Sequence, residues 1–477
     1  MKSPIYNRLM KYNSRRKIKF TAPGHKSKVR MRTESLCRLD LPYYQYFENG
    51  ESTTTAIRAG EEQIAGIFGA ERSFYLNNGA GLGIYAAIAS VCKAGDKIIV
   101  DPECDRAVIN ALTLLALIPV FIKRSYNLKY DINGGINTEE LEYLSEQHHD
   151  AKAMIITSPT YFGVCANIAK AAEIAHENNM VLIVDESLGA HFNFYDSFPE
   201  PALLHGADIV VHSCSETLGG FCGSGLLHIN SKLVSPESVE EQLQMYQGSG
   251  GSSAFVCATE NAIYYAFENG KKYQHLFREI ERGKQLMNRN TDILWFDVEY
   301  NNGSNIDETD ITKIVLNFSK VDISADDAAK ILLRRYAIEA DAVDGDNLVF
   351  SVSLYNTPTE MRRLVNSCMS IAKLASTKIS IEDDEKTAPS RKRVQVMPFK
   401  AFNCDGEKVD FETAAGRLCR KIIYKIPQGT PIIIPGEKIT QRHIDTIASI
   451  LSHGGKVEGI DGQNRIEVLE LGDSFYV

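Results

Sequence analysis

The chain has 477 residues, of which 44% are hydrophobic and 24% are charged, as in an ordinary folded globular protein. At about 100–200 residues per domain, this length predicts two to four domains. The formal net charge of −9 argues against nucleic acid as the main partner, because phosphate binding needs a basic face. The longest nearly uninterrupted apolar stretch, residues 111–122, is too short to span a bilayer, so we expect no membrane partner either.

The amino-terminal segment and the cysteines bear on the cellular compartment. The first 20 residues are basic, contain no Asp or Glu, and lack the apolar run of a secretory signal, although their charge leaves a transit peptide open. The ten cysteines form no C-x-x-C pair and have no regular spacing. Free thiols are typical of a reducing compartment. We therefore expect a cytoplasmic protein without a transition-metal cluster.

Between residues 60 and 230, predicted helices and strands alternate. The predicted helices cover residues 61–69, 79–90, 107–117, 139–148 and 166–178. The predicted strands cover residues 73–76, 97–100, 119–123, 153–156, 181–185 and 208–213. The strands are nearly continuous apolar runs, which is typical of strands buried on both faces. The alternation predicts an α/β fold with a mainly parallel sheet and helices on both faces.

A different pattern follows the Gly/Ser-rich residues 248–253. Helices are predicted within 256–290, where an apolar stripe runs through Tyr273, Leu276, Ile280 and Leu286. Strands are predicted over 313–318 and 348–354. The next helix has a clear start, with Thr357 as N-cap, Pro358 at the first helical position and Glu360 at the third.

These patterns divide the chain into five predicted parts. They are an amino-terminal arm (1–55), a large domain (56–255), a small α/β domain (256–375), a charged linker (376–395) and a carboxy-terminal domain (396–477).

Two local motifs suggest a ligand site. Asp185 closes the strand 181–185, and the carboxyl ends of parallel strands are where α/β sheets bind ligands. A turn or helix-capping role explains Asp185 equally well. The Gly-rich residues 78–83 follow a predicted strand and open a helix, so their N–H groups could face a phosphate. A purely structural turn is the commoner outcome for such a motif.

Several motifs taken in order carry a specific resemblance. They are TAPGHK (21–26), NG (78–79), TSPTYFG (157–163), DE with GAHF (185–192) and SCSETL (213–218). Together they resemble the Orn/Lys/Arg decarboxylase family, which comprises fold-type I pyridoxal phosphate (PLP) enzymes. The tail, with AGR at 415–417 and IPQGTPIIIPGE at 426–437, is similar to the carboxy-terminal domain of that family. The resemblance implies a PLP-transferase-like large domain, a smaller α/β segment and a decarboxylase-like tail.

The resemblance also implies a division of chemical labour. In the family a lysine forms a Schiff base with PLP, and an aspartate keeps the pyridine nitrogen protonated so that the ring accepts the electrons left by CO2. Asp185 matches that aspartate. The positions implied for the cofactor pocket are Gly79, Ala80, Gly81, Asp105, Asp185 and Ser213.

This chain departs from the family pattern at the residues that the resemblance assigns to the cofactor chemistry. Glu216 stands where the family has the Schiff-base lysine, and no lysine occurs between Lys170 and Lys232. Asp105 stands at the position of the stacking histidine, and Leu188 replaces a second histidine. Ala80 and Gly81 replace the hydroxyls of the phosphate loop, and Gln428 replaces a proline of the tail. A carboxylate cannot form an imine, and added negative charge disfavours a phosphate dianion.

Three hypotheses follow. In the first, the chain is a pseudoenzyme with a binding or regulatory role, which forms a homodimer or pairs with an active paralogue and binds PLP weakly and non-covalently or not at all. In the second, it is a PLP- or pyridoxamine-dependent enzyme of altered chemistry, in which Glu216 is the general acid or base. In the third, it decarboxylates arginine, lysine or ornithine, with a lysine from elsewhere. His25 and Lys26 receive no role, and His191 is either a pocket residue or a structural histidine.

Overall fold

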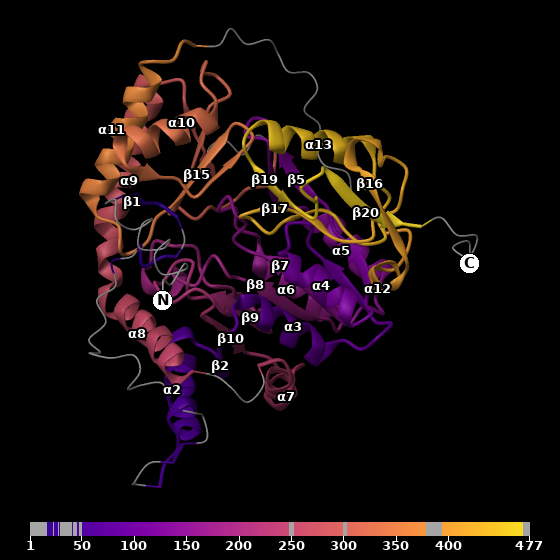
Figure 1. Ribbon diagram of the computed structural model, residues 1–477. Coiled ribbons are helices and arrows are strands. Elements are labelled where there is room, and N and C mark those ends of the chain that lie inside the picture. Colours follow the sequence, from indigo (N-terminus) through magenta and orange to yellow (C-terminus); the bar gives the residue numbers. More distant parts are fainter. Residues whose placement is uncertain are drawn as a thin grey trace, which may run out of the picture.

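The computed structural model describes residues 17–21, 23–26, 28, 41, 45–46, 50–247, 252–298, 303–377 and 394–470. Figure 1 shows three groups of elements: a large sheet flanked by helices, a smaller sheet at the upper left, and the carboxy-terminal elements in yellow above the helices of the large sheet. Within the described parts, no helix is both long and apolar enough to cross a membrane.

The large sheet has seven strands in the order β2-β10-β9-β8-β7-β3-β4. Their bounds are Arg72–Leu76 (β2), Lys97–Val100 (β3), Ile118–Phe121 (β4), Ala153–Thr157 (β7), Val181–Asp185 (β8), Ile209–Ser213 (β9) and Gly225–Ile229 (β10). Strands β3, β4, β7, β8 and β9 run parallel, and β10 is antiparallel to both of its neighbours. The predicted mainly parallel sheet is therefore confirmed, whereas β10 was not predicted.

Helices cover both faces of this sheet. They are α2 (Thr53–Phe68), α3 (Ala80–Val91), α4 (Arg106–Leu114), α5 (Thr138–Gln147), α6 (Ile168–Glu177) and α7 (Pro236–Gln247). Every residue of β7, β8 and β9 is buried. Successive strand residues point to opposite faces, so Ile98 packs in the core that contains α3 and α4, and Ile99 packs in the core that contains α6. A polar hairpin, β5 (Arg124–Asn127) with β6 (Ile132–Ile136), lies beside the sheet.

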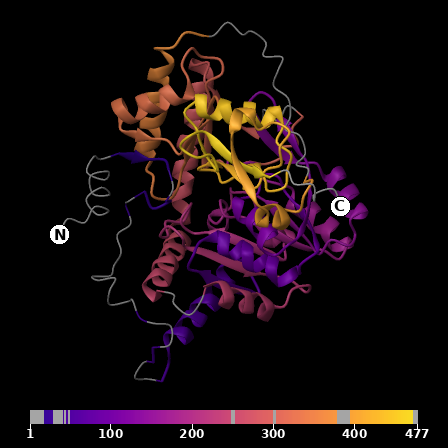
Figure 2. The ribbon, with the colours of Figure 1, turned by 45° about the vertical axis from the view of Figure 1, so that its right-hand side comes forward.

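The second region has a four-stranded antiparallel sheet in the order β11-β12-β15-β14. Its strands are β11 (Leu294–Trp295), β12 (Lys313–Asn317), β14 (Ala342–Asp344) and β15 (Asn347–Ser351). Its helices are α8 (Ser253–Asn269), α9 (Tyr273–Asn290), α10 (Ala325–Ile331) and α11 (Pro358–Ala372). Figure 2 shows α8 and α9 rising from the large sheet toward α11. The capping box at the start of α11 is present as predicted.

One helix prediction needs correction. The buried stripe of α9 runs through Tyr273, Leu276, Ile280 and Met287, whereas Leu286 is 37% exposed. Each residue turns an α-helix by about 100°, so Met287 lies seven residues after Ile280 on the same face and Leu286 points away from it. The predicted limits at 55 and 255 fall inside α2 and α8. The domain limits stay predictions, and most of the predicted linker lies outside the described residues.

The carboxy-terminal elements form a core of their own. They are α12 (Pro398–Asn403), α13 (Gln441–Ser452), β16 (Gly406–Asp410), β17 (Ile423–Ile426), β18 (Pro431–Ile433), β19 (Lys456–Glu458) and β20 (Arg465–Leu469). Strand β16 pairs with β20, and β17 pairs with both β18 and β19. Ile434, which follows β18, joins the core of the large sheet and so anchors the end of β18 against that sheet.

The remaining short elements connect these parts. Strand β1 (Ile18–Lys19) pairs in parallel with β13 (Ile338–Glu339), which ties the amino-terminal segment to the second region. Single 3-10 turns cover Phe192–Phe194, Ala202–His205, Gly270–Lys272 and Phe411–Thr413, and a π-helical turn covers Leu332–Tyr336.

Candidate functional site

A cavity of about 300 Å³ lies at the carboxyl ends of β7, β8 and β9 and of the loop that follows β3. This is the edge at which parallel α/β sheets bind ligands. All seven positions singled out from the sequence line it: Gly79, Ala80, Gly81, Asp105, Asp185, Ser213 and Glu216. The loop between β17 and β18 adds Pro427, Gln428 and Thr430. The structure therefore brings together residues that are far apart in the chain.

Asp185 ends β8 and is 3% exposed. Its Oδ1 accepts hydrogen bonds from the Ser187 N–H, at 3.1 Å, and from the Ser187 hydroxyl. Burial raises the pKa of Asp185 to about 6, against an ordinary value of 3.8, and the nearby Asp105 and Asp101 raise it further. The next residue, Glu186, points elsewhere and pairs with His212 at 2.7 Å. Strand alternation thus separates the two carboxylates.

Glu216 lies in the turn after β9, where the Ser213 and Ser215 hydroxyls are 3.0 Å apart. Burial raises the pKa of the Glu216 carboxyl, and the nearby ammonium groups of Lys313 and Lys26 oppose that rise. Of the described residues that line the cavity, none is a lysine, an arginine or a histidine. The position that the resemblance assigns to the Schiff-base lysine therefore presents a carboxylate to this cavity.

Two buried lysines lie behind this carboxylate. Lys26 is 4% exposed, and its Nζ donates to the backbone oxygens of Thr21 at 2.6 Å and Ser351 at 2.9 Å. Burial lowers the pKa of Lys26 to about 7. The Lys313 Nζ donates to the Ser351 hydroxyl at 2.6 Å and lies 4.6 Å from the ring centroid of Tyr161, which lines the cavity. Sequence reasoning missed Lys313, because nothing in strand β12 marks it as a neighbour of Glu216.

The TAPGHK motif supports the turn that carries Glu216. The Gly24 N–H donates to the Ser215 oxygen at 2.6 Å, and the Ser353 hydroxyl donates to the Gly24 oxygen at 2.5 Å. A Cβ atom at position 24 would come within 2.8 Å of the Thr217 backbone, so only glycine allows this close approach. The motif therefore has a positioning role.

Two further carboxylates come from the loop after β3. Asp105 caps α4, since its Oδ1 accepts from the Ala107 N–H at 2.8 Å. Glu103 also lines the cavity and accepts a hydrogen bond from the Asn133 amide at 2.5 Å. Burial raises the pKa of both carboxyls. Glu103 was not predicted. It follows the carboxyl end of the parallel strand β3, however, and carboxyl ends of parallel strands were the reason for selecting Asp185.

A buried ion pair fixes the floor of the site. Arg124 and Asp101 form two hydrogen bonds, of 2.9 and 2.6 Å, and neither side chain is exposed. Arg124 also donates to the Thr157 oxygen at 2.7 Å, and Asp101 accepts from the Thr157 N–H at 3.1 Å. The pair thus holds Thr157, which lines the cavity, by its backbone. Sequence reasoning did not identify this pair.

The donors expected for a phosphate are fewer than predicted. The Gly79 N–H, one of the possible phosphate donors, donates to the Gly223 oxygen at 2.6 Å and is therefore engaged. Ala80 and Gly81 begin α3, where a helix leaves N–H groups without intrahelical partners. Opposite this short positive end, the carboxylates of Glu103, Asp105, Asp185 and Glu216 line the same cavity. The lining therefore fits the phosphate dianion of PLP poorly and offers its aldehyde no amine.

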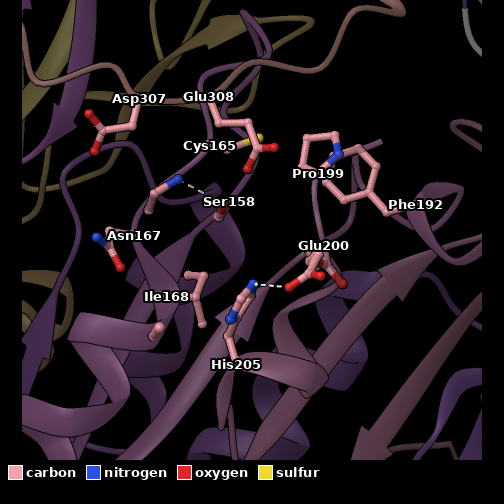
Figure 3. Close-up of a pocket in the computed structure, with 13 residues that line it drawn as sticks. Ser158, Cys165, Asn167, Ile168, Phe192, Pro199, Glu200, His205, Asp307 and Glu308 are labelled. Atoms are coloured by element: carbon pink, nitrogen blue, oxygen red, sulfur yellow. Dashed lines mark hydrogen bonds and ion pairs between the residues drawn. The ribbon is translucent and has the colours of Figure 1, made fainter. Parts of the chain in front are cut away.

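A second cavity, of about 180 Å³, lies outside the predicted site (Figure 3). His205 and Glu200 form an ion pair of 3.1 Å on its wall, and the Ala166 N–H donates to the Ser158 hydroxyl at 3.0 Å. His191 lines neither cavity. It is fully buried, with its Nε2 3.1 Å from the Thr312 hydroxyl and 3.3 Å from the Asp310 carboxylate. Among the residues that the structure describes, no group of three or more His, Cys, Asp or Glu side chains could hold a metal ion.

Comparison with known proteins identifies the family of this chain. The family model "Orn/Lys/Arg decarboxylase, major domain" matches residues 3–320. Arginine decarboxylase of Bacillus subtilis is 26% identical over 466 residues, which cover 96% of this chain and 95% of that protein. Arginine decarboxylase of Bacillus anthracis is 27% identical over 471 residues, with 96% and 94% covered.

Solved structures show the same fold. Lysine decarboxylase A of Pseudomonas aeruginosa superposes with a TM-score of 0.74 at 15% identity, over 98% of this chain and 81% of that one. The constitutive lysine decarboxylase of Escherichia coli gives 0.71 at 18% identity, over 98% and 82%. The family model matches most of the chain, and relatives of this family align over nearly its full length and share its fold. The chain therefore belongs to the Orn/Lys/Arg decarboxylase family.

Proposed function

We propose that this chain is a pseudoenzyme of its family, which has lost Schiff-base decarboxylation and acts as a binding or regulatory subunit. The observation that carries the proposal is the absence of an amine from the cavity wall: Glu216 occupies the lysine position, and no described lining residue is a lysine. An aldehyde cofactor needs a neutral amine to form an imine, and a carboxylate cannot supply one.

The fixed positions of the two nearest lysines support the proposal. Lys26 is held by two backbone oxygens, and Lys313 is held by Ser351 and by Asp341 at 3.5 Å, behind Tyr161. For either amine to reach the cavity, a buried lysine must give up its hydrogen-bond partners, which is costly in a low-dielectric interior. PLP binding in this proposal is weak and non-covalent, or does not occur.

A PLP titration of the purified full-length protein tests this. We expect no imine absorbance band, no PLP adduct after borohydride reduction, and no CO2 release from arginine, lysine or ornithine. Arginine decarboxylase of Bacillus subtilis, treated in parallel, is the positive control. An adduct on any lysine, located by peptide mass spectrometry, or CO2 release above the blank would overturn the proposal.

One observation favours a second candidate, an enzyme of altered chemistry. The pKa of Glu216 is raised by burial, and a general acid or base works best when its pKa approaches the working pH. In this candidate Glu216 moves a proton on an amine–cofactor adduct that enters preformed. Turnover of pyridoxamine phosphate with a 2-oxo acid, whose carbonyl takes up the amino group, would favour it if Glu216→Gln abolishes the reaction and an exposed Asp196→Asn control retains it.

The proposed subunit role implies a partner, either a second copy or an active paralogue. Three large apolar side chains on α4 and α7 are exposed: Leu114 by 65%, Met245 by 75% and Tyr246 by 38%. Exposed apolar groups of this size favour association. Light scattering of the pure protein, followed by co-expression with a lysine-bearing family member, measures this. A monomer in both experiments would remove the partner role.

A further inference from the structure

Arginine side chains form a stripe along the solvent-exposed side of α9. Residues three or four positions apart on a helix share one face. The exposed residues of α9 at this spacing are His275, Arg278, Arg282, Gln285 and Arg289. Among the described residues, the ion pairs of α9 are those of Glu279 and Lys284, so the three arginines of the stripe have none. The stripe is therefore a positive surface on a chain whose net charge is −9.

An acidic surface covers α5 and the adjacent helix α6. The exposed face of α5 includes Glu139, Glu142, Tyr143 and Glu146. On α6, which packs beside α5, Glu173 and Glu177 are exposed. One lysine, Lys170, lies among these carboxylates, and its hydrogen bond with Glu173 at 3.0 Å raises its pKa. The nearby Glu142 and Glu177 raise that pKa further. Within these two helices, five exposed carboxylates therefore face one ammonium group.

Exposed apolar groups give a second, independent indication that these surfaces bind a protein. Tyr143 is 60% exposed among the carboxylates of α5, and Leu286, one helical turn after Arg282, is 37% exposed on α9. Tyrosine and arginine are both enriched in protein interfaces. An arginine over a tyrosine ring also gains cation–π attraction. A tyrosine surrounded by carboxylates therefore suits a helix that presents arginines.

We propose that the arginine stripe of α9 in one copy of this chain binds the acidic surface of α5 and α6 in a second copy. Figure 1 shows α9 on the left of the molecule and α5 on the right, so the two surfaces lie on different sides. A contact between two different surfaces leaves one of each free, so further copies add until a ring closes or a filament forms. Nucleic acid is disfavoured as the partner, because the acidic surface and the net charge repel its phosphates. The contact does not depend on the proposed loss of decarboxylation, and it is separate from the exposed apolar residues of α4 and α7.

Sedimentation equilibrium of the full chain at low and high salt tests the proposal. Because salt screens exposed charges, the weight-average mass should rise with protein concentration in about 20 mM NaCl and fall back in about 500 mM NaCl. A charge reversal turns attraction into repulsion, so Arg282→Glu and Glu142→Arg should each weaken this association roughly 10-fold. An equimolar mixture of the two variants should associate again, because each variant then presents to the other a surface of opposite charge.

Two control variants change the net charge by the same amounts at exposed positions outside both surfaces. They are Lys232→Glu, before α7, and Glu62→Arg, on α2, and both should associate like the unaltered chain. Equal melting temperatures of all variants exclude misfolding as the cause of a loss. The contact would be overturned if the mass does not rise at low salt, if high salt leaves the rise unchanged, or if the mixture of Arg282→Glu with Glu142→Arg stays dissociated.

Discussion

Replacing Asp185 by asparagine should stabilise the folded protein. Asparagine has nearly the same shape as aspartate and keeps an Oδ1 acceptor for the two hydrogen bonds from Ser187. What the substitution removes is a carboxylate that is 3% exposed and that lies near Asp105 and Asp101. The ionised carboxylate destabilises the folded state, because the pKa of Asp185 is about 6 there rather than 3.8.

The pKa gives the size and the pH dependence of the effect. One pH unit corresponds to about 1.4 kcal/mol, so at pH 7 the ionised Asp185 destabilises the folded state by about 3 kcal/mol. Because the folded-state pKa lies above the unfolded-state value, this penalty is complete above pH 6 and disappears as the pH falls toward 3.8. At pH 5 the asparagine variant should retain an advantage of only about 1.5 kcal/mol.

Thermal unfolding at both pH values measures this advantage. With about 2.1 cal/mol/K of unfolding entropy per residue, a cooperative chain of this length has about 1 kcal/mol/K in total. The expected rise in Tm is therefore about 3 °C at pH 7 and about 1.5 °C at pH 5. Asp196→Asn, on the exposed surface, should move Tm at neither pH. An unchanged or lower Tm at pH 7, or a shift of the same size at both pH values, would refute the reasoning.

Three further substitutions test the supporting structure by thermal unfolding. Arg124→Met leaves Asp101 buried without its partner and should cost about 3–5 kcal/mol, so a Tm within a degree of the parent would contradict the buried pair. Thr357→Ala removes the N-cap of α11 and should cost about 1 kcal/mol, which Thr357→Ser should largely restore. Gly429→Ala places a Cβ 2.3 Å from the Asp105 carboxylate at a φ of 76°, so it should lower Tm, and an unchanged Tm would contradict this close approach.

Strand predictions succeeded where a strand is buried on both faces. Ile183 and Val184 pack into opposite cores, so β8 is apolar throughout and is recognisable without alternation. Strand β10 is mostly apolar too, but it begins at Gly225, two residues after Gly223, and such closely spaced glycines are typical of a turn. The polar β5–β6 hairpin carries no hydrophobic period, so sequence pattern alone could not find it.

The residues of the candidate site also fall into two groups, those that the sequence could predict and those that it could not. Asp185, Ser213 and Thr157 all end parallel strands, and the strand-end rule alone could have selected all three. Lys313 and Gln428 come from other parts of the chain and meet the sheet only after it folds. Their relation to Glu216 follows from tertiary packing, which leaves no local trace in either segment.

The residues that depart from the family pattern are not the apolar replacements expected in a pocket that no longer binds a ligand. A pocket that has lost its ligand gains stability when buried charge is replaced by apolar residues, because an unneeded buried anion is only a cost. Here Asp105, Glu216 and Gln428 place polar or charged groups around one cavity, and burial raises the pKa of both carboxyls. The cap that Asp105 gives α4 explains one of the three on structural grounds. Glu216 caps no helix in the described residues, but it lies beside the buried Lys313 and Lys26, whose charges oppose the rise of its pKa, so part of its cost is offset within the fold itself.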